Sequence, residues 1–148
     1  MEQKPKILIT GANGFVGFHL INAALPHFQV FAGVRPKSDC SHLKGMPITV
    51  VELNYSDVSS LTKHFDEYKY DYVVHAAGAT KAANLNEYNI ANAFSTNNLC
   101  KAMKLVPPKK FVFVSSLAAL GPVKYGKENI VLPNSPANPV TSYGKSKL

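Results

Sequence analysis

A glycine-rich segment near the start of the chain limits most strongly what this sequence can fold into. Residues 10–17 read Thr-Gly-Ala-Asn-Gly-Phe-Val-Gly, a GxxGxxG spacing. The apolar run Lys6–Thr10 precedes it, and the run Phe15–Leu25 follows with a helical apolar stripe of Phe15, Val16, Leu20, Ile21 and Ala24. Glycines between a buried strand and a helix predict a tight turn in which backbone N–H groups at the helix start bind the phosphates of a dinucleotide.

Short apolar runs alternate with amphipathic runs along the rest of the chain. We predict further strands at Gln29–Val34, Ile48–Leu53, Tyr72–Ala76 and Lys110–Ser115. We predict helices after Asp57, Ser59 or Ser60 (with Leu61, Phe65 and Tyr68 on one face), over about Leu85–Met103 and from Thr141 or Ser142, and a proline-rich loop over Gly121–Val140. This alternation predicts an α/β fold: a Rossmann domain with a doubly wound parallel sheet of strand order 3-2-1-4-5. Its ligand site is expected beyond the carboxyl ends of the strands.

Composition argues against several other classes of protein. The 148 residues suit one domain, and no apolar run approaches the roughly 20 residues that span a bilayer. The polar start, Met1–Lys6, lacks a signal-peptide core, so we expect a cytoplasmic protein with no membrane partner. Cys40 and Cys100 have neither disulfide-framework nor zinc spacing, so no metal site is expected. The net charge of +7 comes from scattered basic residues, and we therefore expect no nucleic-acid partner.

The residues after the second predicted strand bear on the choice of cofactor. An NAD enzyme usually has an acidic residue there for the ribose 2′-hydroxyl, whereas an arginine accommodates the 2′-phosphate of NADP. Here the strand is followed by Arg35-Pro36-Lys37-Ser38. Arg35 can stack on adenine and pair with a phosphate, and Lys37 and Ser38 can add donors. The sequence favours NADP(H) over NAD(H), and the alternative is an ordinary basic turn.

A tyrosine and a lysine near the end of the sequence have the spacing of a catalytic pair. Tyr143 and Lys147 lie four residues apart, which places them on one face of a helix. A free tyrosine has a pKa of about 10, and a lysine ammonium one turn away favours the phenolate form. Such a pair occurs often by chance, and a surface tyrosine and lysine is the plain alternative.

Six segments together resemble one enzyme family. They are Thr10–Gly17, Asn54–Asp57, His75–Gly78, Asn92–Leu99, Ser116 five residues before Gly121, and Pro139–Lys147. In this order they resemble an extended short-chain dehydrogenase/reductase of the NAD(P)-dependent epimerase/dehydratase group, similar to dihydroflavonol reductases. Asn54 stands where the family usually has aspartate, and Ser95 stands where it usually has glycine.

The resemblance implies roles for named residues. Tyr143 would be the general acid/base, Lys147 would tune it and bind the nicotinamide ribose, Ser116 would polarise the substrate oxygen, and Asn92 would support Lys147 through a water. The cofactor would contact Thr10, Gly11, Asn13, Gly14, Phe15, Val16, Gly17, Arg35, Lys37, Ser38, Asn54, Tyr55, Ala76, Ala77, Gly78, Val114, Tyr143 and Lys147.

These roles leave several functions open. The leading interpretation is an NAD(P)-dependent oxidoreductase acting on a small-molecule carbonyl/alcohol substrate. A nucleotide-sugar epimerase or dehydratase uses the same residues and is the first alternative. A non-catalytic NAD(P)-binding regulatory or scaffold protein is the second, and Arg35 and the Tyr-Lys pair argue against a methyltransferase.

The chain ends one residue past Lys147, whereas family members are about twice as long. We therefore expect the N-terminal part of a longer enzyme, truncated before the sixth strand. We also expect weak cofactor binding, little turnover, and an uncovered sheet face that favours a homodimer.

Overall fold

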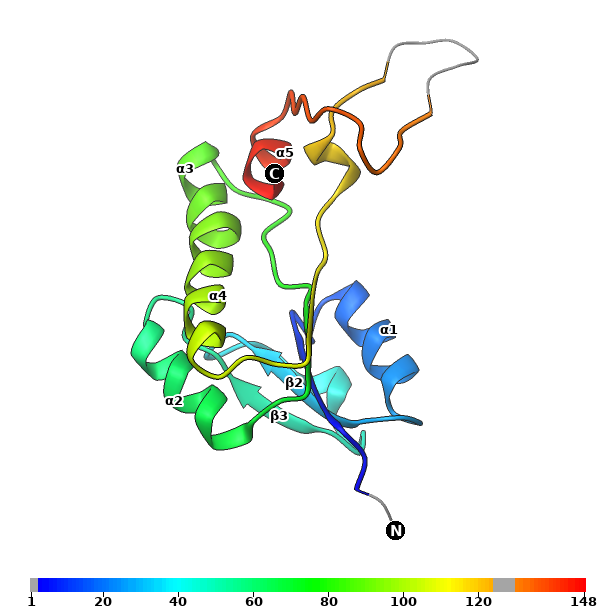
Figure 1. The fold of residues 1–148 in the computed structure, drawn as a ribbon, viewed down its shortest axis with the longest axis vertical. Helices are drawn as coiled ribbons and strands as arrows, with labels where there is room; N and C mark the ends of the chain where they lie inside the picture. Colours follow the sequence, from blue (N-terminus) through cyan, green and yellow to red (C-terminus); the bar gives the residue numbers. More distant parts are fainter. Residues whose placement is uncertain (1–2, 124–129) are drawn as a thin grey trace. The chain divides into compact units, whose positions relative to one another are not determined.

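The computed structural model describes residues 3–123 and 130–148, which fall into two compact units. The first unit contains the chain up to Gly78 together with residues 95–114, and the second contains residues 79–94 and 115–148. Figure 1 shows the course of the chain through both units. We describe each unit separately.

The first unit is built on a parallel sheet of five strands. These strands are β1 (Lys6–Thr10), β2 (Gln29–Val34), β3 (Thr49–Glu52), β4 (Tyr72–His75) and β5 (Lys110–Phe113). Their order is β3-β2-β1-β4-β5, which confirms the predicted doubly wound topology. Leu8 at the centre of β1 lies opposite Phe31 of β2 and Val73 of β4. The carboxyl ends of β1 and β4 therefore come together at Thr10 and His75, where the sheet order reverses.

Helices lie on both faces of this sheet, as Figure 1 shows, but they leave Val112 and Phe113 of β5 46% and 36% exposed, so the sheet is uncovered there. On one face, α1 (Phe15–Ala24) packs through Ile21 and Ala24 on a cluster that includes Ile7 and Ile9 of β1. On the other face, α2 (Val58–Tyr68) and α4 (Ser95–Leu105) bury Leu61, Phe65, Leu99, Ala102 and Met103 in a cluster that includes Leu8. Successive residues of β1 point to opposite faces, which is why a strand covered on both sides is continuously apolar.

Two predicted features of the helices need correction. The stripe predicted for α1 included Phe15 and Val16, but these side chains are 82% and 48% exposed. They lie in the first turn of α1, where Gly17 and not a large side chain approaches the backbone of Gly11 and Ala12. The segment predicted as one helix over about Leu85–Met103 is helical throughout, but it consists of α3 (Leu85–Tyr88), the π-helix η2 (Asn89–Phe94) and α4, and the π-helical turn was not predicted.

The second unit contains α3, η2, the short 3₁₀ helix η3 (Leu117–Ala119) and α5 (Ser142–Lys147). Thr141 caps α5, since its hydroxyl accepts the Gly144 N–H at 2.9 Å. Of the predicted loop, residues 121–123 and 130–140 contain no helix or strand, and residues 124–129 lie outside the described residues. Within the described part of the chain, no helix has the length and apolarity to cross a membrane.

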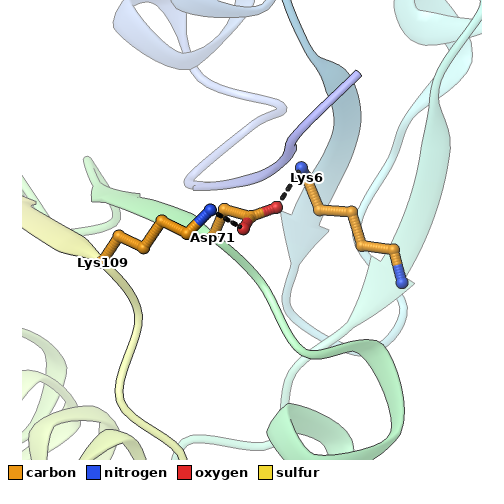
Figure 2. A network of polar contacts seen from close by, with 3 residues as sticks. All are labelled: Lys6, Asp71 and Lys109. Atoms are coloured by element: carbon orange, nitrogen blue, oxygen red, sulfur yellow. Dashed lines mark hydrogen bonds and ion pairs between the residues drawn. The ribbon is translucent and has the colours of Figure 1, made fainter. Parts of the chain in front are cut away.

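A polar network joins the amino ends of three strands of the first unit. The Asp71 carboxylate accepts the Lys6 backbone N–H at 2.8 Å and pairs with the Lys109 ammonium at 2.8 Å (Figure 2). Backbone bonds run beside these contacts, from Asp71 N–H to Lys6 O and from Lys109 N–H to Asp71 O. The Asp71 network, defined by Lys6, Asp71 and Lys109, therefore ties β1, β4 and β5 together at the sheet end opposite the predicted ligand site.

Candidate functional site

The glycine turn between β1 and α1 has no room for side chains at two of its positions. Gly11 has a φ of +66°, and a Cβ added there would lie 2.8 Å from the backbone of Ala77. A Cβ on Gly17 would collide with the Gly11 carbonyl oxygen and lie 2.8 Å from Ala12 Cα. Gly14 caps α1 without a side chain, and its N–H bonds Gly11 O at 2.9 Å. The turn therefore presents backbone at the start of a ten-residue helix, as a phosphate cradle requires.

A buried histidine, His75, lies next to the start of the glycine turn and bonds two threonine hydroxyls. His75 Nδ1 is 2.7 Å from the Thr10 hydroxyl, and His75 Nε2 is 2.9 Å from the Thr96 hydroxyl. The Thr10 hydroxyl also accepts the Ala77 N–H at 3.2 Å. These bonds join the end of β1, the end of β4 and the start of α4. The Thr10 side chain is fully buried and hydrogen-bonded within the protein, and the contact of Thr10 with the cofactor stays a prediction.

The turn after β2 carries the basic residues predicted for the adenosine end. Arg35 and Lys37 are exposed, Lys37 has a φ of +64°, and the Ser38 N–H bonds Arg35 O at 3.1 Å. Asp39 is the next acidic residue, but its carboxylate accepts the Ser41 N–H, and this bond lowers the pKa of Asp39. Ser38 also lines a surface pocket of about 390 Å³ whose other walls are Asp39, Cys40, Ser41, Leu43, Lys44 and Val50. Asn13 reaches this turn through a 3.4 Å bond to Asp39 O.

Asn54 and Tyr55, the predicted adenine contacts, point in different directions. Asn54 is exposed, and its Oδ1 accepts both the N–H and the hydroxyl of Ser56. The Tyr55 side chain is buried in the core, and burial raises the pKa of Tyr55 to about 12, against smaller opposing effects of Thr10 and Arg35. Among the described residues its hydroxyl has no hydrogen-bond partner. Asn98 holds the Tyr55 backbone through a 2.9 Å bond to its carbonyl oxygen.

The remaining predicted cofactor residues follow β4 and β5. Ala76 and Ala77 are half-buried and Gly78 is exposed, directly after β4. Val114 extends the pairing of β5 by one residue, because its N–H bonds His75 O at 3.0 Å. All of these positions belong to the first unit, together with the glycine turn and the basic turn.

The predicted catalytic residues Asn92, Ser116, Tyr143 and Lys147 all belong to the second unit. Tyr143 and Lys147 lie one turn apart in α5, and the Tyr143 ring contacts the Tyr88 ring with centroids 5.9 Å apart. Lys147 is only 5% exposed, and burial lowers the pKa of Lys147. Ser116 caps η3, because its hydroxyl oxygen accepts the Ala118 N–H at 3.2 Å. This bond uses a lone pair of the hydroxyl, so its proton can be donated to a substrate oxygen.

Asn92 is 2% exposed, and its amide group is fully employed within the second unit. Asn92 Oδ1 accepts the Ala79 N–H at 2.7 Å, and Nδ2 donates to Ala79 O at 3.1 Å and to the Ser146 hydroxyl at 2.8 Å. Asn92 therefore directly contacts Ser146, the residue before Lys147. The support of Lys147 by Asn92 through a water stays a prediction.

Sequence reasoning missed four residues with structural roles at these sites. They are His75, Asn98, Ser115 and Ser146. Ser115 donates from its hydroxyl to Lys147 O at 2.8 Å. Of these, His75, Asn98 and Ser146 lie inside motif segments that the sequence analysis names, whereas Ser115 lies outside them. Within the described residues, no group of three His, Cys, Asp or Glu side chains is placed to hold a metal ion.

Comparison with known proteins places these features in context. Residues 7–148 match the NAD dependent epimerase/dehydratase family. A dTDP-D-glucose 4,6-dehydratase of Dictyostelium discoideum is 31% identical over 126 residues, which cover 75% of this chain and 29% of that protein. The solved UDP-Glc/GlcNAc 4-epimerase of Campylobacter jejuni matches with a TM-score of 0.85 and 25% identity, over 97% of this chain and 46% of that one. The Bordetella bronchiseptica enzyme WbmG, solved in complex with NAD, matches with a TM-score of 0.84 and 27% identity, over 98% and 47%. The chain spans less than half the length of each of these relatives.

Proposed function

Because the chain belongs to the NAD dependent epimerase/dehydratase family, we propose that it supplies the nucleotide-binding part of an enzyme that epimerises or dehydrates a nucleotide sugar. Two relatives support this choice over a dihydroflavonol-reductase-like activity, since one is a sugar-nucleotide dehydratase and the other a 4-epimerase. The observation that carries the proposal is the Tyr143–Lys147 pair, held one turn apart on a capped helix with the lysine buried.

The residues of the first unit fit a nicotinamide dinucleotide. The pyrophosphate would lie against the backbone from Gly11 to Gly17, where a methyl group on Gly11 or Gly17 would clash with the backbone. The adenosine end would lie toward the turn at Arg35. When bound, the nicotinamide supplies the hydride acceptor and donor of the reaction.

The residues of the second unit can move and hold the proton. Tyr143 takes a proton from a sugar hydroxyl and returns it, and the Lys147 ammonium stabilises the phenolate through its charge. Burial lowers the pKa of Lys147, so this amine holds its proton less tightly than an exposed lysine. Ser116 donates a hydrogen bond to the same substrate oxygen.

The test is an assay of the full-length protein with UDP- and dTDP-sugars, with or without added cofactor. We expect interconversion or dehydration of the sugar without net change in absorbance at 340 nm, because the hydride returns to the substrate. The Tyr143→Phe variant should lose about 100-fold or more in kcat, whereas Tyr68→Phe, a matched change in the first unit, should not. Stoichiometric consumption of reduced cofactor with a ketone would support the reductase instead. Absence of both activities would contradict an enzymatic role.

The identity of the cofactor is a separate proposal. WbmG binds NAD, yet the turn after β2 here offers Arg35 and no acidic side chain before Asp39. We expect tighter binding of NADP than of NAD, and we expect Arg35→Ala to weaken NADP binding about tenfold while NAD binding changes little. Lys63→Ala removes one charge from α2 and serves as the control. Equal affinities for the two cofactors in the unchanged protein would contradict this proposal.

A further inference from the structure

The helix that carries Tyr143 and Lys147 is too short to be stable by itself. It has six residues, whereas isolated helices below about 12 residues are marginal in water. Its position therefore depends on contacts with the rest of the second unit. Three of these are the Thr141 cap, the bond from Ser115 to Lys147 O, and the close approach of Gly144 to the Ala118 carbonyl.

A further contact is made by Ser146 and reaches the π-helix. The Ser146 side chain, 6% exposed, accepts from Asn92 Nδ2 at 2.8 Å and donates to Tyr143 O at 2.8 Å. The Ser146 hydroxyl is therefore the acceptor of one hydrogen bond and the donor of the other. Asn92 is in turn held on Ala79 by two bonds that resemble strand pairing. Because the Ala79 N–H can only donate, these bonds also fix which atom of the amide faces Ser146.

The π-helical turn explains how Asn92 reaches this place. A π turn contains an extra residue, which shifts the side chains of its two flanks relative to one another. Such turns are frequent at functional sites. Asn92 lies inside η2 (Asn89–Phe94), and its side chain is the buried group of that element.

We propose that Ser146 is a positioning residue, which locks α5 to the π-helix through Asn92 and thereby fixes the directions of Tyr143 and Lys147. The catalytic part of this inference rests on the proposed function. The lock itself is a property of the second unit and can be measured without turnover.

The first experiment measures kinetics of the full-length protein with Ser146→Ala, Asn92→Ala and the double variant. We expect Ser146→Ala to lower kcat by about 10- to 100-fold, since small displacements of reacting groups are costly. KM and the cofactor Kd should change less than about threefold, because the phosphate turn is untouched. The kcat of the double variant should be no lower than that of the more impaired single variant, because both changes remove the same hydrogen bond between Asn92 and Ser146. Multiplicative losses, or a wild-type kcat per folded molecule in Ser146→Ala, would overturn the proposal.

The second experiment uses amide hydrogen exchange and needs no substrate. Ser146→Ala should accelerate exchange at the Lys145, Leu148 and Ala79 amides, which bond Thr141 O, Gly144 O and Asn92 Oδ1. Lys145→Gln, at an exposed position of the same helix, is the control. If amide exchange in Ser146→Ala equals that of the unchanged protein, the inference about Ser146 is wrong, even if the enzyme is active. If exchange is faster but the unchanged protein has no activity, only the proposed function is wrong. If Ser146→Ala does not fold, Ser146→Thr keeps the hydroxyl and should keep both kcat and protection; loss of either would count against the lock.

Discussion

The three glycines of the phosphate turn differ in what a methyl group would meet. At Gly17 it would meet the Gly11 carbonyl and Ala12, both of them backbone. At Gly14 the nearest atom is Gly11 O at 3.2 Å, and the residue is exposed. Backbone cannot move aside as a flexible side chain can. We therefore expect that the fold requires glycine at position 17, whereas at position 14 only the bound ligand requires it.

We predict that Gly14→Ala weakens binding of the nicotinamide dinucleotide by about tenfold or more, because the methyl group enters the phosphate space. Its cost in stability should stay below about 1 kcal/mol, the range of helix-cap substitutions. Gly17→Ala should cost about 1–3 kcal/mol by overpacking and should lose binding as well. Calorimetric titration and urea unfolding measure both. Unchanged affinity in Gly14→Ala would argue against a phosphate at this turn.

His75 illustrates how a motif residue can act without touching a ligand. Its ring stacks near Phe111 and Phe113 and bridges two threonine hydroxyls. We predict that His75→Phe keeps the packing but removes these bonds beside the buried Thr10, and so lowers the free energy of unfolding by about 1–3 kcal/mol. The exposed His27→Phe is the control for urea unfolding. Wild-type stability of His75→Phe would mean that the bridge contributes nothing.

At the scale of elements, the periodicity of apolar residues predicted the bounds of most strands and helices to within two residues. It did not predict the type of helix or the burial of a side chain where contacts with distant residues determine them. The segment from Leu85 has helical spacing, yet six of its residues form a π-helix. Asn92, inside this π-helix, bonds Ala79 thirteen residues earlier. Nothing local reveals that partner. Similarly, Phe15 and Val16 continue the apolar stripe of α1 but lie exposed in its first turn. There Gly17 is the residue that packs on the glycine turn, at Gly11 and Ala12.

Sequence signals for helix ends were reliable where the hydrogen-bond partner lies a few residues away in the chain. Asp57, Ser59 and Ser60 were the three predicted candidates for the cap of α2, and Asp57 is the cap, since its carboxylate accepts the Ser60 N–H at 3.0 Å. We predict that Asp57→Ala lowers the free energy of unfolding by about 1 kcal/mol, since it leaves a first-turn N–H without its cap. Asp66→Ala removes the same group from the other half of α2 and should be neutral or slightly stabilising. Equal losses in the two variants would point to a general effect of charge.

For the whole molecule, the sequence predicted the sheet order and the residues at each strand end, because alternation and chain handedness restrict the topology. It did not predict how the second unit holds α5. Ser115 and Ser146 act there through main-chain carbonyls of Lys147 and Tyr143 and through a distant amide. Main-chain partners carry no sequence signal, so this part of the candidate site became visible only in three dimensions.

The Asp71 network, at the opposite end of the sheet, gives the first unit a pH-dependent stability. The hydrogen bond from Lys109, and then that from the Lys6 N–H, hold the pKa of Asp71 below its usual value of 3.8. The unfolded chain therefore binds a proton at a higher pH than the folded one. The stabilisation is complete above pH of about 4 and is lost as the pH falls through the folded-state pKa.

We predict that Asp71→Asn lowers Tm by about 1–3 °C at pH 7, a small effect because the carboxylate and the Lys109 ammonium are partly or largely exposed. The asparagine can still accept the Lys6 N–H, so the variant isolates the charge. The difference from wild type should shrink below pH 4, and at about 1 M salt, where the Debye length falls to about 3 Å. Asp66→Asn, an exposed carboxylate of α2, should show neither trend. A Tm difference that is constant from pH 7 to pH 3 would show that the charge of Asp71 does not stabilise the junction of β1, β4 and β5.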